Sequence, residues 1–358
     1  MSLRSQQFPF GHRHRGVLAP ALGTRRHFPR RWRGWIAVTV ALLALTGCSS
    51  VGDSSEGKLV IATTVSPLTN IVANIAGSNA DVTGIVPEGT NSHTFEPAPQ
   101  VAELLARADL VFVNGLKLED PTLELAKSNL KSGASIVELG TTVLPENQWI
   151  YDFSFPKSEG KPNPHLWTSP LFALKYAEVV RDALVKKDPK HADDYKSNFT
   201  KYAAQLNALA NALRADTATL APASRTLLTY HDAYAYFARD FGWKVIGAVQ
   251  PKNFEDPTPV EVARLIDQVR ANKVKVIFGS EVFPSNVLAE IGRATGAKYE
   301  ESLRDDDLPG APGATEHSLV GLLRYDYRTM ITGLGGTATN LDALDVANTV
   351  TDTATYPQ

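Results

Sequence analysis

The sequence predicts an α/β protein in which two regions of alternating strands and helices flank one long helix. Three observations support this fold class. Apolar, β-branched runs alternate with helical patterns, as in parallel βαβ units. The stretch 193–220 contains neither Gly nor Pro and keeps a helical apolar spacing. The alternation restarts after it, and both regions open with an apolar strand that leads into a helix ending at a glycine. We therefore expect two similar lobes.

The first region is expected over residues 58–188. Its opening run KLVIATT is apolar and β-branched, and Pro67 opens a helix that reaches Gly77. Pro97 and Pro99 suit the first turn of the next helix. The expected strands lie at 58–64, 81–86, 110–113 and 135–139, and the first two helices at 67–77 and 100–108.

The linking helix is assigned to residues 189–222. Within it, apolar side chains recur on one helical face of the stretch 193–220, whose 28 residues at 1.5 Å each span roughly 40 Å. Such a helix suits a rigid link between two lobes, but a long helix within one domain fits the pattern as well. The apolar face carries Phe199, Tyr202, Leu206, Leu209 and Leu213.

The second region is expected over residues 223–336. Its strands are predicted at 225–230, 244–249, 274–278 and 297–303, and its helices at 232–241, 259–271 and 284–295. The segment after Gly333, which includes a tail at 337–358, is rich in Thr, Ala and Asp, and we expect it to be partly disordered.

Residues 1–47 have the composition of a secretory leader. They contain eight arginines, no lysine and no acid, and an apolar run at 36–45 ends in small residues. A basic region, a short apolar run and small residues are typical of a signal peptide. Ten apolar residues are too few to span a bilayer as a helix.

Cys48 follows this leader and is the only cysteine, so an internal disulfide is excluded. The stretch LTGC resembles the bacterial lipobox, in which the cysteine is lipidated and becomes the mature N-terminus. The resemblance implies a lipid anchor on Cys48 that holds the protein at the extracytoplasmic face of the cell membrane. Residues 48–57, rich in Ser, Gly and acids, would form a flexible tether.

Removal of the leader changes the charge of the chain. The mature part keeps 28 basic residues against 38 acidic ones, a net charge of about −10. Binding to nucleic acid needs the opposite sign, so nucleic acid is not an expected partner.

Three of the five histidines outside the leader occupy equivalent places. His93 in NSHTFEPAP, His165 in NPHLW and His231 in YHD each lie in a loop or at the end of a strand, and DDD at 305–307 follows the last strand. The carboxyl ends of parallel strands meet at one sheet edge, where such folds bind ligands. A lone loop histidine needs no function, but three imidazoles and a carboxylate can form a four-coordinate site for a divalent metal.

The four segments NSHTFEPAP, NPHLW, YHDAYAYFARDFG and DDDLPG, the last followed by LLRYDY, closely resemble the signature regions of the metal-receptor lipoproteins of zinc and manganese ABC importers, the ZnuA, TroA and PsaA family. The similarity runs in order from KLVIATT to about Leu334. It implies two αβ lobes joined by a rigid helix, with one metal ion in the cleft between them. It also implies delivery of the ion to an ABC permease and its ATPase, and we expect a monomer.

The resemblance also implies the ligands. His93, His165 and His231 match the first three, and Asp306 matches the fourth best, although a shift by one residue to Asp305 or Asp307 stays open. Two further acids are candidates for supporting roles. Glu281 is a reserve ligand or a partner of one, and Glu96 is expected to orient a ligand histidine or to fix its loop.

Other acids and histidines receive structural interpretations. Asp232 is expected to cap the start of a helix, where an acid also suits the helix dipole. His191 and His317 lie in polar stretches without a motif and are interpreted as surface residues.

His231 at the third ligand favours Zn²⁺ over Mn²⁺, because the family's manganese carriers often have Glu there and nitrogen donors favour zinc. The segment 146–163 lacks the histidines that many zinc receptors carry, so manganese stays open. Two other functions are considered. A zinc-dependent hydrolase would need an open metal position, and the chain has no HExxH motif. A surface adhesin is compatible with lipid anchoring, but no residue argues for it.

Overall fold

The computed structural model describes residues 57–282 and 286–358. The expected leader at 1–47, Cys48 and the tether up to residue 56 lie outside the described residues, so these assignments stay predictions. Residues 57–358 form one structural unit. Within the described ranges, no helix combines the length and the apolar composition needed to cross a membrane.

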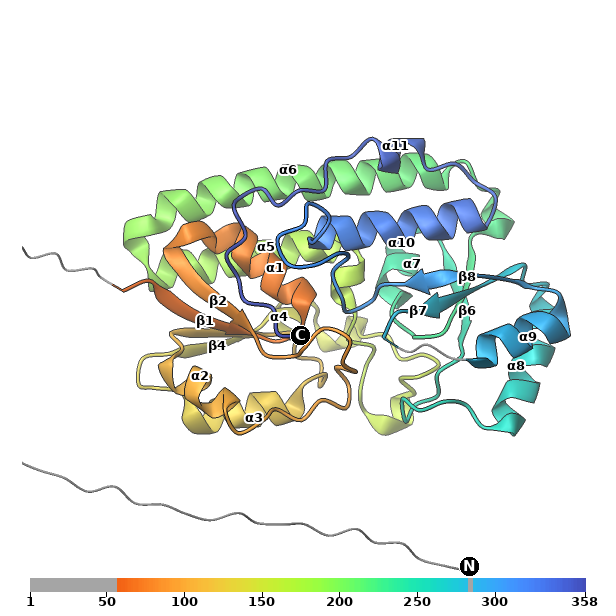
Figure 1. The fold of residues 1–358 in the computed structure, drawn as a ribbon, viewed down its shortest axis with the longest axis horizontal. Coiled ribbons are helices and arrows are strands. Elements are labelled where there is room, and N and C mark those ends of the chain that lie inside the picture. Colours follow the sequence, from red (N-terminus) through yellow and green to blue (C-terminus); the bar gives the residue numbers. More distant parts are fainter. Residues whose placement is uncertain (1–56, 283–285) are drawn as a thin grey trace, which may run out of the picture. The chain divides into compact units, whose positions relative to one another are not determined.

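The N-terminal lobe is built on a parallel sheet in the order β2-β1-β3-β4. Its strands are β1 (Leu59–Thr63), β2 (Ala80–Gly84), β3 (Leu110–Val113) and β4 (Ser135–Glu138). Helix α1 (Ser66–Ala76) is buried over its whole length, while α2 (Val101–Arg107) and α3 (Asp120–Asn129) cover the opposite face (Figure 1). Strand side chains alternate between the faces, so Ile61 and Ala62 enter separate apolar clusters.

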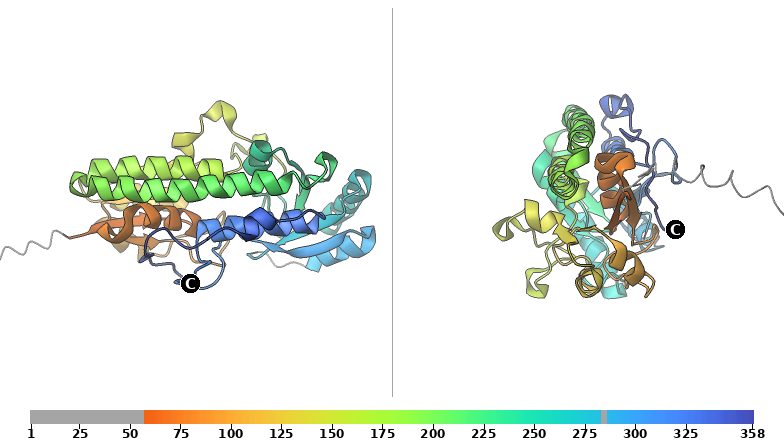
Figure 2. Two further views of the ribbon diagram at one scale, coloured as in Figure 1. Left: turned by 90° about the horizontal axis from the view of Figure 1, so that it is seen from above. Right: turned by 90° about the vertical axis from the view of Figure 1, so that its left-hand side faces the viewer.

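Two long helices pack side by side against α1, as Figure 2 shows. They are α5 (Pro170–Lys187) and α6 (Ala192–Thr217). The 26 residues of α6 correspond to about 39 Å, which confirms the long helix. Its buried face includes Tyr202 and Leu206, and α6 contacts α1 of one lobe and α10 of the other. It therefore belongs to the packing of both lobes.

The C-terminal lobe repeats the topology of the first, with a parallel sheet in the order β6-β5-β7-β8. Its strands are β5 (Thr226–Thr229), β6 (Lys244–Ala248), β7 (Val276–Ser280) and β8 (Lys298–Leu303). Its helices are α7 (Ala235–Phe241), α8 (Pro259–Asn272), α9 (Asn286–Thr295) and α10 (Leu319–Gly333). The predicted fold class of two parallel-sheet α/β lobes with one long helix is confirmed.

Local sequence signals explain several element boundaries. Helix α8 begins with a capping box, in which Thr258 and Glu261 bond reciprocally to each other's main chain, and Pro259 occupies the first helical position. Helix α7 ends at Gly242, whose φ of 70° suits a residue without a Cβ. The remaining short helices are α4 (Leu139–Val143) and 3₁₀ turns at Gly77–Asn79, Glu146–Gln148, Lys157–Glu159, Leu166–Thr168, Pro189–His191 and Pro222–Ser224.

The expectation of a partly disordered tail is wrong. Helix α11 (Thr339–Asp342) packs on α6, and the segment after it returns to the N-terminal lobe, where Thr355 pairs with Thr83 of β2. Leu341, Val346 and Tyr356 are buried. Composition could not reveal this order, because it depends on partners supplied by distant helices.

Candidate metal centre

Three histidines converge between the two lobes. His93 and His165 come from loops of the N-terminal lobe, and His231 follows β5 of the C-terminal lobe. Their Nε2 atoms lie 3.2 Å (His93 to His165), 3.2 Å (His93 to His231) and 2.9 Å (His231 to His165) apart. A tetrahedral zinc ion with its usual bond lengths would separate its nitrogen ligands by about 3.3 Å. The three nitrogens therefore have the spacing of donors around one ion.

Two of the imidazoles are held through their other ring nitrogen. His165 Nδ1 lies 2.9 Å from Asn163 Oδ1, and His231 Nδ1 lies 2.6 Å from Gln250 Oε1. An amide oxygen can only accept a hydrogen bond, so Nδ1 carries the proton of the neutral ring and the lone pair of Nε2 is free for a metal. His93 is fixed differently: its ring stacks on Phe254 with centroids 4.2 Å apart and an interplanar angle of 2°.

The imidazoles are neutral in this environment. Burial lowers the pKa of His93 and His165 well below the ordinary value, and the nearby His231 ring lowers both further. Burial also lowers the pKa of His231, against the opposing effect of the Asp306 carboxylate. A metal ion binds only unprotonated imidazoles, so these histidines are in the protonation state that a cation requires.

The acidic loop 305–308 brings carboxylates to this group. Asp306 Oδ2 accepts a hydrogen bond of 2.5 Å from Ser92, the residue before His93, and Oδ1 is buried without a hydrogen-bond partner in the described residues. Asp305 Oδ1 accepts from Ser280 at 3.1 Å, and Oδ2, also lacking such a partner there, lies 3.5 Å from His231 Nε2. Both aspartates offer an oxygen that a cation would satisfy.

The third aspartate points elsewhere, because Asp307 Oδ2 accepts from the main-chain N–H of Gly89 at 2.6 Å. Burial raises the pKa of Asp305 and of Asp306 to about 7 and that of Asp307 to about 6. A bound cation would favour their ionised forms. Asp306 as fourth ligand stays a prediction, and Asp305 is its competitor.

The two acids expected in supporting roles are placed differently. Glu281 Oε1 accepts from the main-chain N–H of Asp305 at 3.1 Å, so Glu281 supports the acidic loop. Burial raises its pKa well above the ordinary value, with Asp305 as the next cause. Glu96 is exposed, and no contact among the described residues joins it to a histidine.

Two structural interpretations are wrong. Helix α7 starts at Ala235, so Asp232 does not cap it; the buried Asp232 carboxylate instead accepts from the main-chain N–H of Ser154 at 2.9 Å. His317 is only 1% exposed and lies beside Glu88. His191 is partly exposed, with Nδ1 2.5 Å from Asp188.

Sequence reasoning missed the residues that hold the imidazoles. Asn91 and Asn163 each accept a hydrogen bond from the main-chain N–H of the histidine two residues later. The repeated Asn-x-His of NSH and NPH was the signal for these turns. Gln250 and Phe254 carried no comparable signal, because they reach His231 and His93 only through the folding of the chain.

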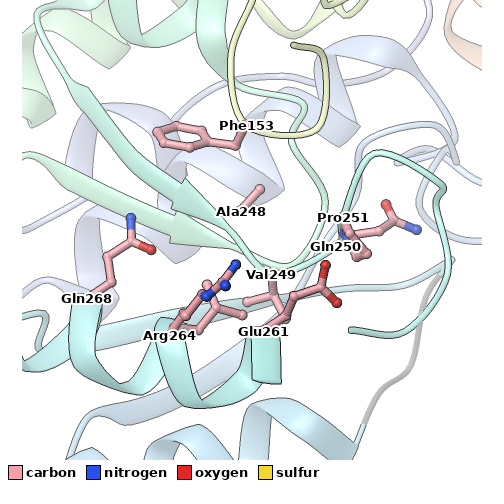
Figure 3. A pocket seen from close by; sticks show the side chains of 9 residues that line it. Phe153, Ala248, Val249, Gln250, Pro251, Glu261, Arg264 and Gln268 are labelled. Carbon is pink, nitrogen blue, oxygen red and sulfur yellow. The ribbon is translucent and has the colours of Figure 1, made fainter. Parts of the chain in front are cut away.

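A pocket of about 170 Å³ is lined in part by Gln250, and Figure 3 shows the side chains around it. None of the three histidines lines it. Its polar lining includes Glu261, Arg264 and Gln268 of α8, and Phe153 forms part of its wall. The histidine centre is therefore separate from this pocket, and Gln250 is the residue common to the pocket and the contacts of His231.

Two α/β lobes with a buried histidine cluster between them define a class of protein, the metal receptors of membrane transporters. The chain matches the family described as "Zinc-uptake complex component A periplasmic" over residues 61–333, and it belongs to that family. The family consists of substrate-binding proteins of metal ABC transporters, not of enzymes, so the hydrolase alternative is excluded.

Relatives of this chain have names that refer to different metals. The iron-binding protein YfeA of Yersinia pestis is 32% identical over 301 residues, which cover 83% of this chain and 94% of that protein. The manganese-binding lipoprotein MntA of Halalkalibacterium halodurans is 28% identical over 304 residues, covering 84% and 97%.

Solved structures share the fold. The periplasmic zinc-binding protein TroA from Treponema pallidum superposes with a TM-score of 0.70 at 24% identity, covering 78% of this chain and 99% of that one. A manganese-bound periplasmic metal-binding protein from Candidatus Liberibacter asiaticus superposes with a TM-score of 0.69 at 26% identity, covering 77% and 100%.

Proposed function

We propose that this chain captures one divalent transition-metal ion with His93, His165, His231 and Asp306, and delivers it to the permease of an ABC importer. The observation that carries the proposal is the convergence of three Nε2 atoms within 3.2 Å of one another, from both lobes. His93 lies in the loop after β2 and His231 directly after β5, at the carboxyl ends of parallel strands, where such folds bind ligands, whereas His165 comes from the segment after α4.

Asp306 is the proposed fourth ligand because of how its carboxylate is held. Ser92 fixes Oδ2 from the N-terminal lobe and leaves the buried Oδ1 available. A ligand carboxylate is commonly oriented by such a hydrogen bond. Asp305 lies near His231 and would add negative charge beside the ion.

Zinc is the proposed cargo, with manganese as the alternative. Three imidazole nitrogens are borderline-soft donors, which favour zinc over manganese. The relatives named for iron and manganese make the choice a matter for experiment. The proposed anchoring through lipid on Cys48 would keep the receptor at the extracytoplasmic face of the membrane, next to the permease and its ATPase.

Elemental analysis of residues 57–358 tests this proposal, both as purified and after dialysis against equal concentrations of Zn²⁺ and Mn²⁺. We expect one equivalent of zinc that manganese does not displace. Retention of manganese in the competition would keep the receptor function but overturn the zinc assignment. A protein that binds neither metal would contradict the proposed function.

A further inference from the structure

The segment after α11 has no counterpart in the family match, which ends at residue 333. We call residues 343–358 the C-terminal strap. It first runs along α6, where Gln205 Nε2 donates to the carbonyl oxygens of Asp345 (3.1 Å) and Ala347 (2.8 Å). Figure 1 shows it continuing from α11 across to α1 and β2. Arg324 of α10 also donates to the carbonyl oxygen of Leu344 at 3.2 Å, so the strap contacts elements of both lobes.

Buried polar side chains fasten the strap to α1. Asn70 and Asn74 donate to Asn348 Oδ1 at 2.9 and 2.8 Å, and both are almost completely buried. Asn348 Nδ2 in turn donates to the carbonyl oxygen of His317 at 3.1 Å. A buried side-chain amide without a hydrogen-bond partner is unfavourable. Asn70 and Asn74 therefore favour the position of the strap in which Asn348 pairs with them.

The strap ends beside the loop that follows β2. Thr355 exchanges main-chain hydrogen bonds with β2, donating to Val82 and accepting from Gly84, both at 2.9 Å. The N–H of Glu88 then donates to Pro357 O at 3.1 Å, and Gln358 Nε2 donates to Glu88 Oε2 at 3.0 Å. The strap thereby reaches the loop that carries Ser92 and His93.

Glu88 is the point where the strap, the acidic loop and the segment before α10 meet. Its Oε1 accepts from the main-chain N–H of Leu308 at 3.3 Å and lies 3.3 Å from His317 Nε2. The His317 ring packs edge-on against Tyr356 of the strap, with centroids 4.6 Å apart. One carboxylate of the N-terminal lobe thus contacts three separate segments from the second half of the chain.

The Glu88 carboxylate is ionised in this setting. Burial raises its pKa, but the nearby His317 ring and the hydrogen bond from Gln358 outweigh burial and bring the pKa below the ordinary value. An ionised acceptor forms the stronger kind of hydrogen bond. Leu308 follows Asp305 and Asp306 closely, so this bond restrains the part of the loop that carries them.

We propose that Glu88 is a positioning residue which, together with His317 and the C-terminal strap, holds the acidic loop 305–308 against the histidines and slows loss of the metal. The proposal rests on the proposed function above. A loop that is already ordered loses less conformational freedom when it binds, so its contribution to affinity is larger.

Metal loss from Glu88→Ala, followed with an excess of chelator, tests this. We expect dissociation about tenfold faster than from the wild type, the lower end of the effect of removing a residue that orients a ligand. Glu88→Gln keeps an acceptor oxygen for Leu308 and should recover most of the loss. The matched control is Asp109→Ala, which removes another carboxylate that accepts a main-chain N–H, that of Val60, away from the acidic loop.

Amide hydrogen exchange of the loop supplies a second readout, with Glu88→Gln as the conservative variant. We expect faster exchange of residues 305–308 in Glu88→Ala, wild-type-like exchange in Glu88→Gln, which keeps the acceptor for Leu308, and no change in Asp109→Ala. Equal dissociation rates in Glu88→Ala and Asp109→Ala, or unchanged exchange of the loop, would overturn the positioning role. A wild type that binds no metal would contradict the proposed function, while the exchange experiment would still test the role of Glu88.

Discussion

The two lobes have the same sheet topology but bring different chemistry to the centre. The N-terminal lobe supplies two neutral imidazoles, His93 and His165. The C-terminal lobe supplies His231 and the acidic loop, in which Asp305 and Asp306 are almost completely buried. Among the candidate ligands, those of the N-terminal lobe are therefore neutral, and the potential negative charge comes from the C-terminal lobe.

This asymmetry suits a cation, which offsets the cost of ionising the buried aspartates of the C-terminal lobe. Buried carboxylates are costly to ionise without a partner, and the raised pKa values of Asp305 and Asp306 express that cost. At the proposed site, a divalent ion would remove this cost on the C-terminal side and would gain nitrogen ligands from the N-terminal side. We therefore expect the two lobes to be held together more strongly with the ion bound than in the metal-free protein.

Loss of one imidazole from either lobe should have the largest effect. We expect His165→Ala and His231→Ala each to weaken zinc binding by more than about 100-fold, beyond the range typical of residues that only orient a ligand. Competition with a chromophoric chelator measures the affinity, and circular dichroism checks that the fold is intact. Near-wild-type affinity in either folded variant would remove that residue from the ligand set.

Replacement of single carboxylates separates the two aspartates of the C-terminal lobe. Asp306→Asn keeps the shape but removes the ligand charge, and we expect it to weaken zinc binding by about 100-fold, against about tenfold for Asp305→Asn. Isothermal titration of both variants provides the comparison. The reverse order would transfer the ligand role to Asp305, the alternative that its contact with His231 supports.

The stability of the metal-free protein should depend on pH with opposite signs for the two kinds of group. The pKa of Asp306 is raised from the ordinary 3.8 to about 7 in the folded chain. The protonated carboxyl therefore contributes its full share to the free energy of unfolding below pH 3.8, and this share is lost as the pH rises through 7. The pKa of His93 and that of His165 are lowered from the ordinary 6.5. These two histidines therefore lower the free energy of unfolding as the pH falls below 6.5.

Thermal unfolding between pH 4 and 8 measures this dependence, because it spans the ordinary and the raised pKa of Asp306. We expect Asp306→Asn, which cannot ionise, to lose less stability than the wild type as pH rises through this range. Saturating zinc should also reduce the loss, because the ion favours the ionised carboxylate. Parallel curves for the wild type and Asp306→Asn would show that this carboxylate does not titrate as described.

The smallest effect is expected at the contact between Phe254 of the C-terminal lobe and the His93 ring. Phe254→Leu keeps an apolar side chain but removes the ring stacking, which contributes about 0.5–1.5 kcal/mol, or roughly two- to tenfold in affinity. The same titration measures it, with Phe153→Leu as a control at an exposed aromatic residue. An unchanged affinity would show that the stack does not hold His93.

The sequence predicted the strands, the long helix and the three histidines because those signals are local. A histidine directly after an apolar strand, as at His231, lies at a known edge of a parallel sheet. Gln250 gave no such signal, since it meets His231 only when β5 and β6 pair. The burial of His317 and the order of the strap were missed for the same reason, because their partners Glu88 and Asn70 are more than 200 residues away.

Anomalous X-ray scattering at the zinc edge, from crystals of residues 57–358 grown with one equivalent of zinc, tests the central claim most directly. We expect a single strong peak about 2.0–2.1 Å from the Nε2 atoms of His93, His165 and His231, with an oxygen of Asp306 completing the coordination. A peak bound elsewhere, with these three nitrogens free of metal, would contradict the assignment of the centre.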